Sequence, residues 1–337
     1  MLLTCVIGAS GYTGAELIKI ISRHPQLNLE TCFVSDGSQY AGKSASEVHP
    51  ELQFICDLPL VELTPDKLAS IKDDFDIVFL ATPHEFSHDK LPSMLSARAK
   101  VFDLSGAYRL QNTADFAHFY GFAHLHPNSL SKAVYGLAEW YESDIANAAF
   151  DAVPGCYPTA SLLALKPLLE NNLLNTAHMP VINATSGVSG AGKKASMTSS
   201  FYEVSLQAYG VLSHRHTPEI EAYANNPVIF TPHLGAFKRG ILATLTAFTN
   251  SNVSEQDIQK AYEKAYKNSP LIRLRNTMPK VDQVANTPFC DIGFAYDPAK
   301  KCIVVTSAID NLLKGASSQA IQCCNIALGI DQTTGLL

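Results

Sequence analysis

The feature that most constrains the fold is a glycine loop near the amino terminus. The stretch "CVIGASGYTGAEL", residues 5–17, joins a strand-like run to a helix-like one and spaces its glycines as G-x-x-G-x-x-G. Glycines at such a junction let the chain turn sharply and pack helix on strand, and free N–H groups at the helix start attract an anion. The loop therefore favours a nucleotide-binding unit, with a merely tight turn as the alternative.

Strand-like and helix-like segments alternate through the first 150 residues. The strand-like runs are "LLTCVI", "LNLETCFVS", "FDIVFLATP" and "AKVFDLSG", and helix-like sequence such as "GAELIKIISRH" lies between them. This rhythm predicts an α/β fold of Rossmann type, a doubly wound parallel sheet with helices on both faces. Ligands bind at the carboxyl ends of such strands, so Pro83, just after a buried run, is a candidate cofactor contact.

The sequence changes character after residue 150. Longer strand-like stretches follow, and the turn "YDPAKKC" joins two of them, so part of this half is antiparallel. One helix interrupts the strands, with Ser254 as its N-cap and Glu255 and Asp257 in its first turn. We expect an α+β domain over 151–310 with a mixed, largely antiparallel sheet, and a helix in the segment that begins at 311.

Composition and charge restrict the class of protein. With 47% hydrophobic residues and a net charge of −6 without a basic stripe, we expect a globular protein with a small-molecule partner, and neither nucleic acid nor membrane. The eight cysteines show no C-x-x-C spacing, which predicts neither a metal site nor a disulfide framework. The apolar "MLLTCVIGASG" lacks the basic region of a signal peptide, and a cytoplasmic location is the expectation.

The end of the second predicted strand indicates which nucleotide binds. NAD-binding proteins usually carry an acidic residue here for the ribose 2′-hydroxyl. This chain has Ser35, Ser38 and Lys43, which suit a 2′-phosphate, beside Asp36, which also fits an ordinary polar loop. NADP(H) is therefore the expected cofactor. Further candidate cofactor contacts lie in the glycine loop itself: Gly8, Ser10, Gly11, Tyr12, Thr13 and Gly14.

Cys156 in "AVPGCYPTAS" precedes an apolar, helix-like run. If Pro158 takes the first helical position, the thiol lies just outside the amino end of a helix. That location lowers the pKa of a thiol, and the helix N–H groups can hold an oxyanion. Cys156 is thus a candidate nucleophile, and an inert buried cysteine is the alternative.

A candidate acid/base lies in "SHRHTPEIEAYA". Thr217 can cap a helix that begins at Pro218, with Glu219 in its first turn. His214 and His216 lack the i, i+4 spacing of a helical metal pair. A lone histidine is usually structural, but two before a helix favour one as the partner of a thiol, and His216 is the first choice because it abuts the helix start.

Two loops carry candidate anion-binding residues. The segment "ATSGVSGAGKKAS" ends a strand in a glycine-serine loop that contains Lys193 and also Gly190, a further candidate cofactor contact, and "DLSGAYRL" contains Ser105 and Arg109. Backbone N–H groups and lysine can bind an anionic group of a substrate, and arginine suits a planar carboxylate or a phosphate. The alternative for each is a solvated loop charge.

Four motifs together resemble one enzyme family. "GASGYTGAEL", "PGCYPTA", "SGVSGAGKK" and "HRHTPEI", in this order and along the whole chain, look like N-acetyl-gamma-glutamyl-phosphate reductases, relatives of aspartate-semialdehyde and glyceraldehyde-3-phosphate dehydrogenases. The resemblance implies a Rossmann domain, 1–150, completed by a C-terminal helix, 311–337, and a catalytic and oligomerisation domain, 151–310. It also implies that Asn311 lies near the nicotinamide.

The same resemblance implies a reaction in arginine biosynthesis. N-acetyl-glutamyl 5-phosphate and NADPH are reversibly converted to N-acetyl-glutamate 5-semialdehyde, NADP and phosphate, through a thioester on Cys156, while His216 moves the proton. Glu219 is a candidate substrate contact beside those in the two loops. A homodimer or homotetramer is expected, and long strands in the second domain suit a sheet-mediated interface.

One position departs from the family's pattern. Members commonly have Asn before "PGCYPT", whereas this chain has Val153, which cannot hydrogen-bond through its side chain. We interpret the usual Asn as serving local structure only. Two rival functions remain: a reductase of aspartyl phosphate or of a carrier-bound aminoadipyl phosphate, and a non-catalytic NADP-sensing protein with an inert Cys156.

Overall fold

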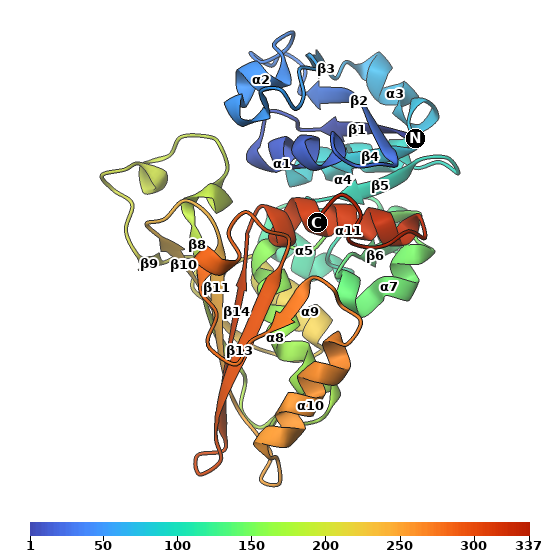
Figure 1. Ribbon diagram of the computed structural model, residues 1–337. Coiled ribbons are helices and arrows are strands. Elements are labelled where there is room, and N and C mark those ends of the chain that lie inside the picture. Colours follow the sequence, from blue (N-terminus) through green and yellow to red (C-terminus); the bar gives the residue numbers. More distant parts are fainter. The chain divides into compact units, whose positions relative to one another are not determined.

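The computed structural model describes residues 1–337 apart from the side chain of Thr198. The chain forms two compact units. The first unit contains residues 1–117, 121–155 and 316–337, and the second contains residues 118–120 and 156–315. Figure 1 shows their helices and strands and labels most of them. No helix in the described part of the chain is long and apolar enough to cross a membrane.

The first unit is built on a parallel sheet of seven strands in the order β3-β2-β1-β4-β5-β7-β6. The strands are β1 (Leu2–Ile7), β2 (Leu27–Val34), β3 (Leu60–Glu62), β4 (Ile77–Leu80), β5 (Lys100–Asp103), β6 (Ala133–Tyr135) and β7 (Phe150–Ala152). All residues of β4 are buried, because a central parallel strand is covered on both faces. The predicted buried run is confirmed there.

Helices cover both faces of this sheet, as the alternating pattern predicts. They are α1 (Tyr12–Ile21), α2 (Ala45–Val48), α3 (Pro65–Asp74), α4 (His84–Met94), α5 (Thr113–Tyr120), which extends into the second unit, α6 (Pro127–Leu130), α7 (Ala138–Ala146) and α11 (Ser318–Ala327). Val6 of β1 packs in a core with α1 and α11, and Ile7 packs in a second core with α3 and α4. The Rossmann-type fold is thereby confirmed.

The C-terminal helix differs from its predicted extent. The segment Leu313–Ser317 forms a π-helical turn, and α11 then runs only from Ser318 to Ala327. This helix, red in Figure 1, packs beside α1 and α7, far from it in the sequence. Its polar residues Gln319, Gln322 and Asn325 are fully buried. The helix is therefore enclosed on all sides and does not present one apolar stripe.

The second unit contains a mixed sheet of seven strands in the order β12-β13-β14-β11-β8-β10-β9. The strands are β8 (Val181–Gly187), β9 (Gln207–Ala208), β10 (Ile229–Gly235), β11 (Ile241–Phe248), β12 (Ile272–Leu274), β13 (Cys290–Asp297) and β14 (Cys302–Ile309). Four of the six strand pairs are antiparallel, including the β13–β14 hairpin at the predicted turn. The largely antiparallel sheet is confirmed.

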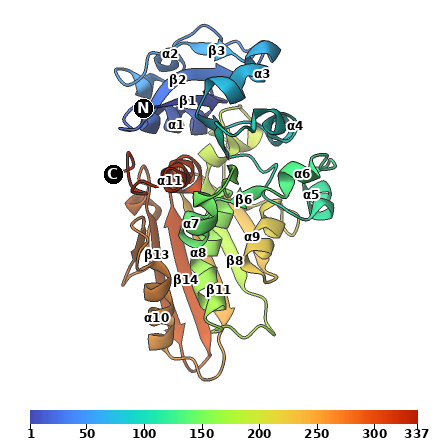
Figure 2. The ribbon, with the colours of Figure 1, turned by 90° about the vertical axis from the view of Figure 1, so that its right-hand side faces the viewer.

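Three helices belong to this unit: α8 (Cys156–Glu170), α9 (His216–Ala224) and α10 (Glu255–Tyr266). Helix α8 packs against β11 and β14, and α10 packs against α8 (Figure 2). Burial alternates along β11, so one face of the strand is buried and the other half-exposed. Ser254 caps α10, as predicted, and it also forms a capping box with Asp257.

Candidate active site

Cys156 is the first residue of α8, and not a residue outside it as the sequence suggested. Pro158 is the third helical residue. The prediction placed the proline at the first position, but none of the first four helical N–H groups has an intrahelical partner, so a proline is tolerated at any of them. Cys156 is half-buried. The thiol therefore lies in the first turn of α8, at the positive end of the helix dipole.

A cavity of about 560 Å³ in the second unit opens beside this cysteine. Residues from α5, α8, β8, β9, β10, α9 and the loops between them form its wall. They are Phe119, Cys156, Tyr157, Ser186, Gly187, Gly190, Ala191, Gln207, Tyr209, Gly210, Ser213, His214, Arg215, His216 and Leu234. The cavity brings together all three predicted catalytic side chains, the thiol and both histidines.

His214 is enclosed by aromatic rings. Its ring centroid lies 5.7 Å from that of Tyr157 and 5.5 Å from that of Tyr209. Burial, and then the nearby Arg215 guanidinium, lower the pKa of His214 to about 4. The Nδ1 atom accepts a hydrogen bond of 3.1 Å from the His216 main-chain N–H. His214 is therefore a neutral hydrogen-bond acceptor near pH 7, and it holds the start of α9.

His216 is the first residue of α9, and its side chain is buried. The predicted helix start at Pro218 with Thr217 as cap was wrong, because the helix begins two residues earlier and Arg215 precedes it as the N-cap residue. The His216 ring centroid lies 4.8 Å from that of His214 and 5.9 Å from that of Tyr157. Glu219, in the first turn, is fully buried.

Two tyrosines and an arginine in the cavity were missed by the sequence reasoning. The Tyr209 hydroxyl donates to the Tyr157 hydroxyl over 3.1 Å, and the Tyr157 hydroxyl donates to the main-chain oxygen of His233 over 3.0 Å. Burial raises the pKa of Tyr157, so it stays protonated. Arg215 is the only lysine or arginine among the described residues that line the cavity. The sequence could have indicated two of them, because Tyr157 directly follows Cys156 and Arg215 lies between the two histidines.

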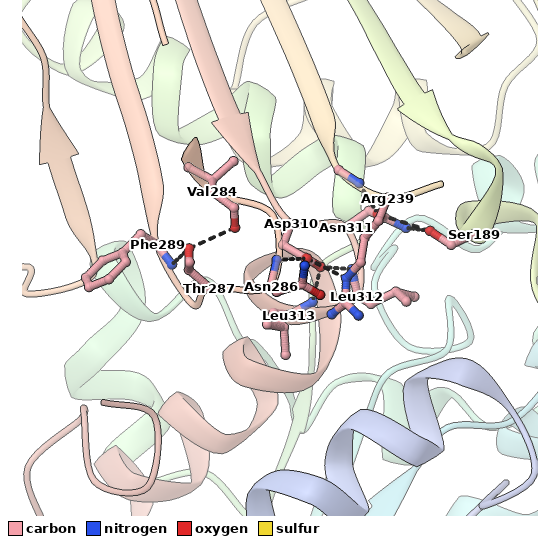
Figure 3. A network of polar contacts seen from close by, with 11 residues as sticks. Ser189, Arg239, Val284, Asn286, Thr287, Phe289, Asp310, Asn311, Leu312 and Leu313 are labelled. Carbon is pink, nitrogen blue, oxygen red and sulfur yellow. Dashed lines mark hydrogen bonds and ion pairs between the residues drawn. The ribbon is translucent and has the colours of Figure 1, made fainter. Parts of the chain in front are cut away.

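The predicted glycine-serine loop is tied to the end of β14 (Figure 3). The Asn311 Nδ2 donates to the Ser189 Oγ over 3.0 Å, and its Oδ1 accepts from the Gly240 N–H over 2.7 Å. Gly190 lines the cavity, whereas Lys193 is exposed and is not one of the described lining residues. The structure thus joins Asn311 and Gly190 to the cavity wall, through the loop that follows β8.

The three glycines of the first loop differ in what they allow. Gly8 has φ of +91°, and a Cβ there would lie 2.2 Å from the Ala81 oxygen. A Cβ at Gly14 would lie 2.4 Å from the Gly8 oxygen, so this glycine permits close packing of α1 on the loop. At Gly11, before α1, the nearest atom to an added Cβ is 3.6 Å away. The first and last glycines are needed sterically, and the middle one leaves open backbone at a helix start, which fits a pyrophosphate.

The other predicted cofactor contacts lie at loops of the first unit. Ser10 is in the glycine loop, while Tyr12 and Thr13 begin α1, and Pro83 precedes α4 directly after β4. Ser35, Ser38 and Lys43 follow β2. The Ser38 Oγ accepts from the Tyr40 N–H over 3.3 Å, and the Lys43 ammonium lies 5.9 Å from the Tyr40 ring centroid.

Arg109 and Ser105 lie within the first unit and are buried. The Arg109 Nε donates to the Val153 oxygen over 2.7 Å, and its Nη2 donates to the Leu104 oxygen over 2.8 Å. Ser105 donates through both its N–H and its Oγ to Asp103, each over 2.9 Å. The Val153 side chain is fully buried in the apolar core. A valine therefore suits this position, and its main-chain oxygen accepts the Arg109 hydrogen bond.

One cluster of metal-binding residue types lies in the first unit: His88, Asp89 and His126. The His88 Nε2 accepts from the Leu125 N–H over 2.9 Å, so its Nδ1 carries the proton and donates to Asp89 over 2.7 Å. Both ring nitrogens of His88 are engaged in hydrogen bonds, and the His126 ring packs against the His88 ring with centroids 4.8 Å apart.

Comparison with known proteins identifies the two units. Residues 4–148 match the NAD binding domain of semialdehyde dehydrogenases, and residues 156–311 match the semialdehyde dehydrogenase dimerisation domain. The N-acetyl-gamma-glutamyl-phosphate reductase of Pseudoalteromonas atlantica is 57% identical over 337 residues, which cover this chain and 98% of the relative. That of Yersinia pseudotuberculosis is 55% identical over 338 residues and the full length of both chains.

Solved structures show the same fold. Aspartate semialdehyde dehydrogenase II from Vibrio cholerae aligns with a TM-score of 0.71 over 98% of both chains, at 15% sequence identity. The aspartate semialdehyde dehydrogenase with NADP from Candida albicans aligns with a TM-score of 0.66 over 97% of this chain and 98% of that one, also at 15% identity. The motifs, the cavity and the full-length identity agree, and the chain belongs to the N-acetyl-gamma-glutamyl-phosphate reductase family.

Proposed function

We propose that the chain catalyses the NADPH-dependent reduction of N-acetyl-glutamyl 5-phosphate to N-acetyl-glutamate 5-semialdehyde and phosphate, a reversible step of arginine biosynthesis. The observation that carries this proposal is the cavity in which a helix-start thiol, Cys156, lies with His214 and His216. The family names support it, because relatives more than half identical over their full length carry this activity in their name.

In the proposed reaction the Cys156 thiolate attacks the acyl carbon of the substrate. A C–S bond forms, the C–O bond to phosphate breaks, and phosphate leaves with the electron pair, which gives a thioester. The first-turn N–H groups of α8 stabilise both the thiolate and the oxyanion that develops on the carbonyl. NADPH, when bound, supplies the hydride that reduces the acyl group to the aldehyde level.

The histidines handle the proton in this scheme. Reduction leaves an oxyanion on the former carbonyl, and protonated His216 donates the proton that makes it a thiohemiacetal. As the thiohemiacetal collapses, its hydroxyl returns this proton to His216, the C–S bond breaks and the thiolate returns to Cys156. His214 is neutral near pH 7, since its pKa is lowered to about 4 by burial and by Arg215. It accepts the His216 N–H, and we assign it the task of holding His216 in place.

We assign the cofactor to the first unit. Gly8 and Gly14 allow the tight loop, and the open backbone at Gly11 leaves room for a pyrophosphate at the start of α1. Ser10, Tyr12 and Thr13 border this place in the sequence, and Pro83 precedes α4 in the loop after β4. Ser35, Ser38 and Lys43 are the proposed contacts to the 2′-phosphate. Asn311 and Gly190 remain the proposed contacts to the nicotinamide side.

The substrate carries a carboxylate besides its acyl phosphate, and we propose that Arg215 binds one of these anionic groups. Its guanidinium is the permanent positive charge in the described cavity wall. Lys193 in the loop after β8, Glu219 in the first turn of α9, and Ser105 with Arg109 stay proposed substrate contacts from the sequence. The hydrogen bonds of Arg109 to two main-chain oxygens favour a supporting role for it.

We also propose that the second unit forms a homodimer or homotetramer through its sheet. The family match names this region a dimerisation domain. The half-exposed face of β11, with Leu242, Thr244 and Thr246, supplies a surface of suitable character. The expected compartment is the reducing cytoplasm, which suits a mechanism that depends on a thiolate.

The test measures the phosphate-dependent reduction of NADP with N-acetyl-glutamate 5-semialdehyde. Parallel assays use aspartate semialdehyde as the alternative substrate and NAD as the alternative cofactor. Wild-type turnover with the acetylated substrate and NADP, and its near-complete loss in Cys156→Ser, are expected, since serine lacks the accessible thiolate. Preference for aspartate semialdehyde would reassign the substrate. Preference for NAD would overturn the role of Ser35, Ser38 and Lys43.

A further inference from the structure

The turn after the last strand of the second unit is fixed by one buried carboxylate. Asp310 is fully buried, and its oxygens accept from four donors on three segments of the chain (Figure 3). Its Oδ1 accepts from the N–H groups of Leu312 (2.8 Å) and Leu313 (2.9 Å), as the N-cap of a helix does. Its Oδ2 accepts from the Arg239 Nε (2.5 Å) and the Asn286 N–H (2.6 Å).

The turn that Asp310 caps contains Gly315, which lies against Cys156. The Gly315 N–H donates to the main-chain oxygen of Asp310 over 2.9 Å, the i to i+5 spacing of a π-turn. A Cβ at Gly315 would lie 2.7 Å from the Cys156 Cβ and 3.2 Å from its Cα. Both distances are below the ~3.5–4.0 Å of an ordinary carbon–carbon contact. Only glycine lets the turn approach the cysteine this closely.

The same turn supports a second part of the cavity wall. Asn311, the residue after Asp310, binds Ser189 and the Gly240 N–H. Gly190, next to Ser189, lines the cavity, and a Cβ there would lie 3.8 Å from the Asn311 Nδ2. One short turn therefore borders the cysteine at one end and the loop after β8 at the other.

We propose that Asp310 and Gly315 are positioning residues for Cys156. The inference rests on the proposed role of Cys156 as nucleophile. The carboxylate holds the turn, and the turn bounds the space around the Cys156 Cβ, so the thiol keeps one place in the first turn of α8. Positioning of this kind matters because a displacement of about 1 Å can cost on the order of a hundredfold in rate.

The experiment compares Gly315→Ala with a matched control, Gly293→Ala. A Cβ at Gly293 would lie 2.6 Å from the Thr277 oxygen, so both changes crowd the second unit to a similar degree. Gly293 is not among the described residues that line the cavity. The rate at which iodoacetamide alkylates Cys156 is measured against pH by peptide mass spectrometry. The kcat and the Kd for NADP are measured alongside. Alkylation needs no substrate, so it tests positioning whichever substrate the enzyme takes.

Gly315→Ala should lower kcat by about 10–100-fold and slow the alkylation of Cys156 near pH 7, with the Kd for NADP nearly unchanged. Gly293→Ala should lower the thermal stability and keep the alkylation profile. Asp310→Asn keeps the size of the side chain but removes its charge, and it should shift the profile in the same direction. It decides the question if Gly315→Ala does not fold.

The proposal is overturned if Gly315→Ala keeps the wild-type alkylation profile and kcat, even if Cys156→Ser is inactive. If Gly315→Ala does not fold, the same result for Asp310→Asn overturns it. If the wild type does not turn over the acetylated substrate while the profile of Gly315→Ala is shifted, positioning stands and the proposed function fails. The two failures are therefore distinguishable.

Discussion

The neutral state of His214 can be measured as a pH-dependent loss of stability. Burial and the Arg215 charge lower its pKa from 6.5 to about 4. Between these values the unfolded chain binds a proton that the folded chain does not. The contribution of His214 to stability is therefore complete above the unfolded pKa and is lost as the pH falls toward the folded pKa.

The magnitude follows from the size of the window. Each pH unit below the unfolded pKa lowers the free energy of unfolding by ~1.4 kcal/mol until the folded pKa is reached. The stability that His214 loses between neutral pH and about pH 5 is therefore about 2 kcal/mol. In His214→Asn the amide oxygen can still accept the His216 N–H, but the titration is gone. The free energy of unfolding of the wild type should therefore fall by about 2 kcal/mol relative to that of the variant between about pH 7 and about pH 5.

Denaturant unfolding near pH 7 and near pH 5 provides the measurement. The control is His178→Asn, because His178 is an exposed imidazole of the same unit. A free-energy difference for His214→Asn that is the same at both pH values would refute the reasoning. It would mean that His214 takes up a proton in the folded enzyme as readily as in the unfolded chain.

Three further predictions concern the cofactor loop, the substrate and the core. Gly14→Ala should lower the melting temperature, because its Cβ would lie 2.4 Å from a main-chain oxygen, whereas Gly11→Ala should fold and bind NADP more weakly; thermal unfolding and a fluorescence titration distinguish them. Arg215→Gln should raise the KM of the acyl substrate by about 10–100-fold, the cost of a charged hydrogen bond, in steady-state assays. Burial raises the pKa of Asp151 well above its usual range, so Asp151→Asn should stabilise the protein progressively as pH rises, by ~1.4 kcal/mol per unit up to the folded pKa, in denaturant unfolding at several pH values.

Much of the fold could be predicted because its strands are locally distinctive. A central parallel strand such as β4 is a continuous apolar run, and the polar turn between β13 and β14 predicts their hairpin. Helix starts were less predictable. Pro158 and Pro218 are each the third residue of their helix, and the sequence could not tell which position of the first turn a proline takes.

The site was predictable only where residues chemically typical of catalysis stand in a short motif. Cys156, His214 and His216 are of this kind, and the structure places them around one cavity. Tyr209 directly follows β9, a strand of only two residues that has no recognisable sequence pattern. Gly315 gave no signal either, because the residue that requires a glycine there, Cys156, lies more than 150 residues earlier in the chain.

The central claim is that Cys156 carries the acyl group as a thioester. The direct measurement is peptide mass spectrometry of the enzyme mixed with N-acetyl-glutamate 5-semialdehyde and NADP in the absence of phosphate. An N-acetyl-glutamyl adduct on the Cys156 peptide, released on addition of phosphate and absent from Cys156→Ser, is the predicted result. An adduct on another residue, or full turnover by Cys156→Ser, would contradict the account.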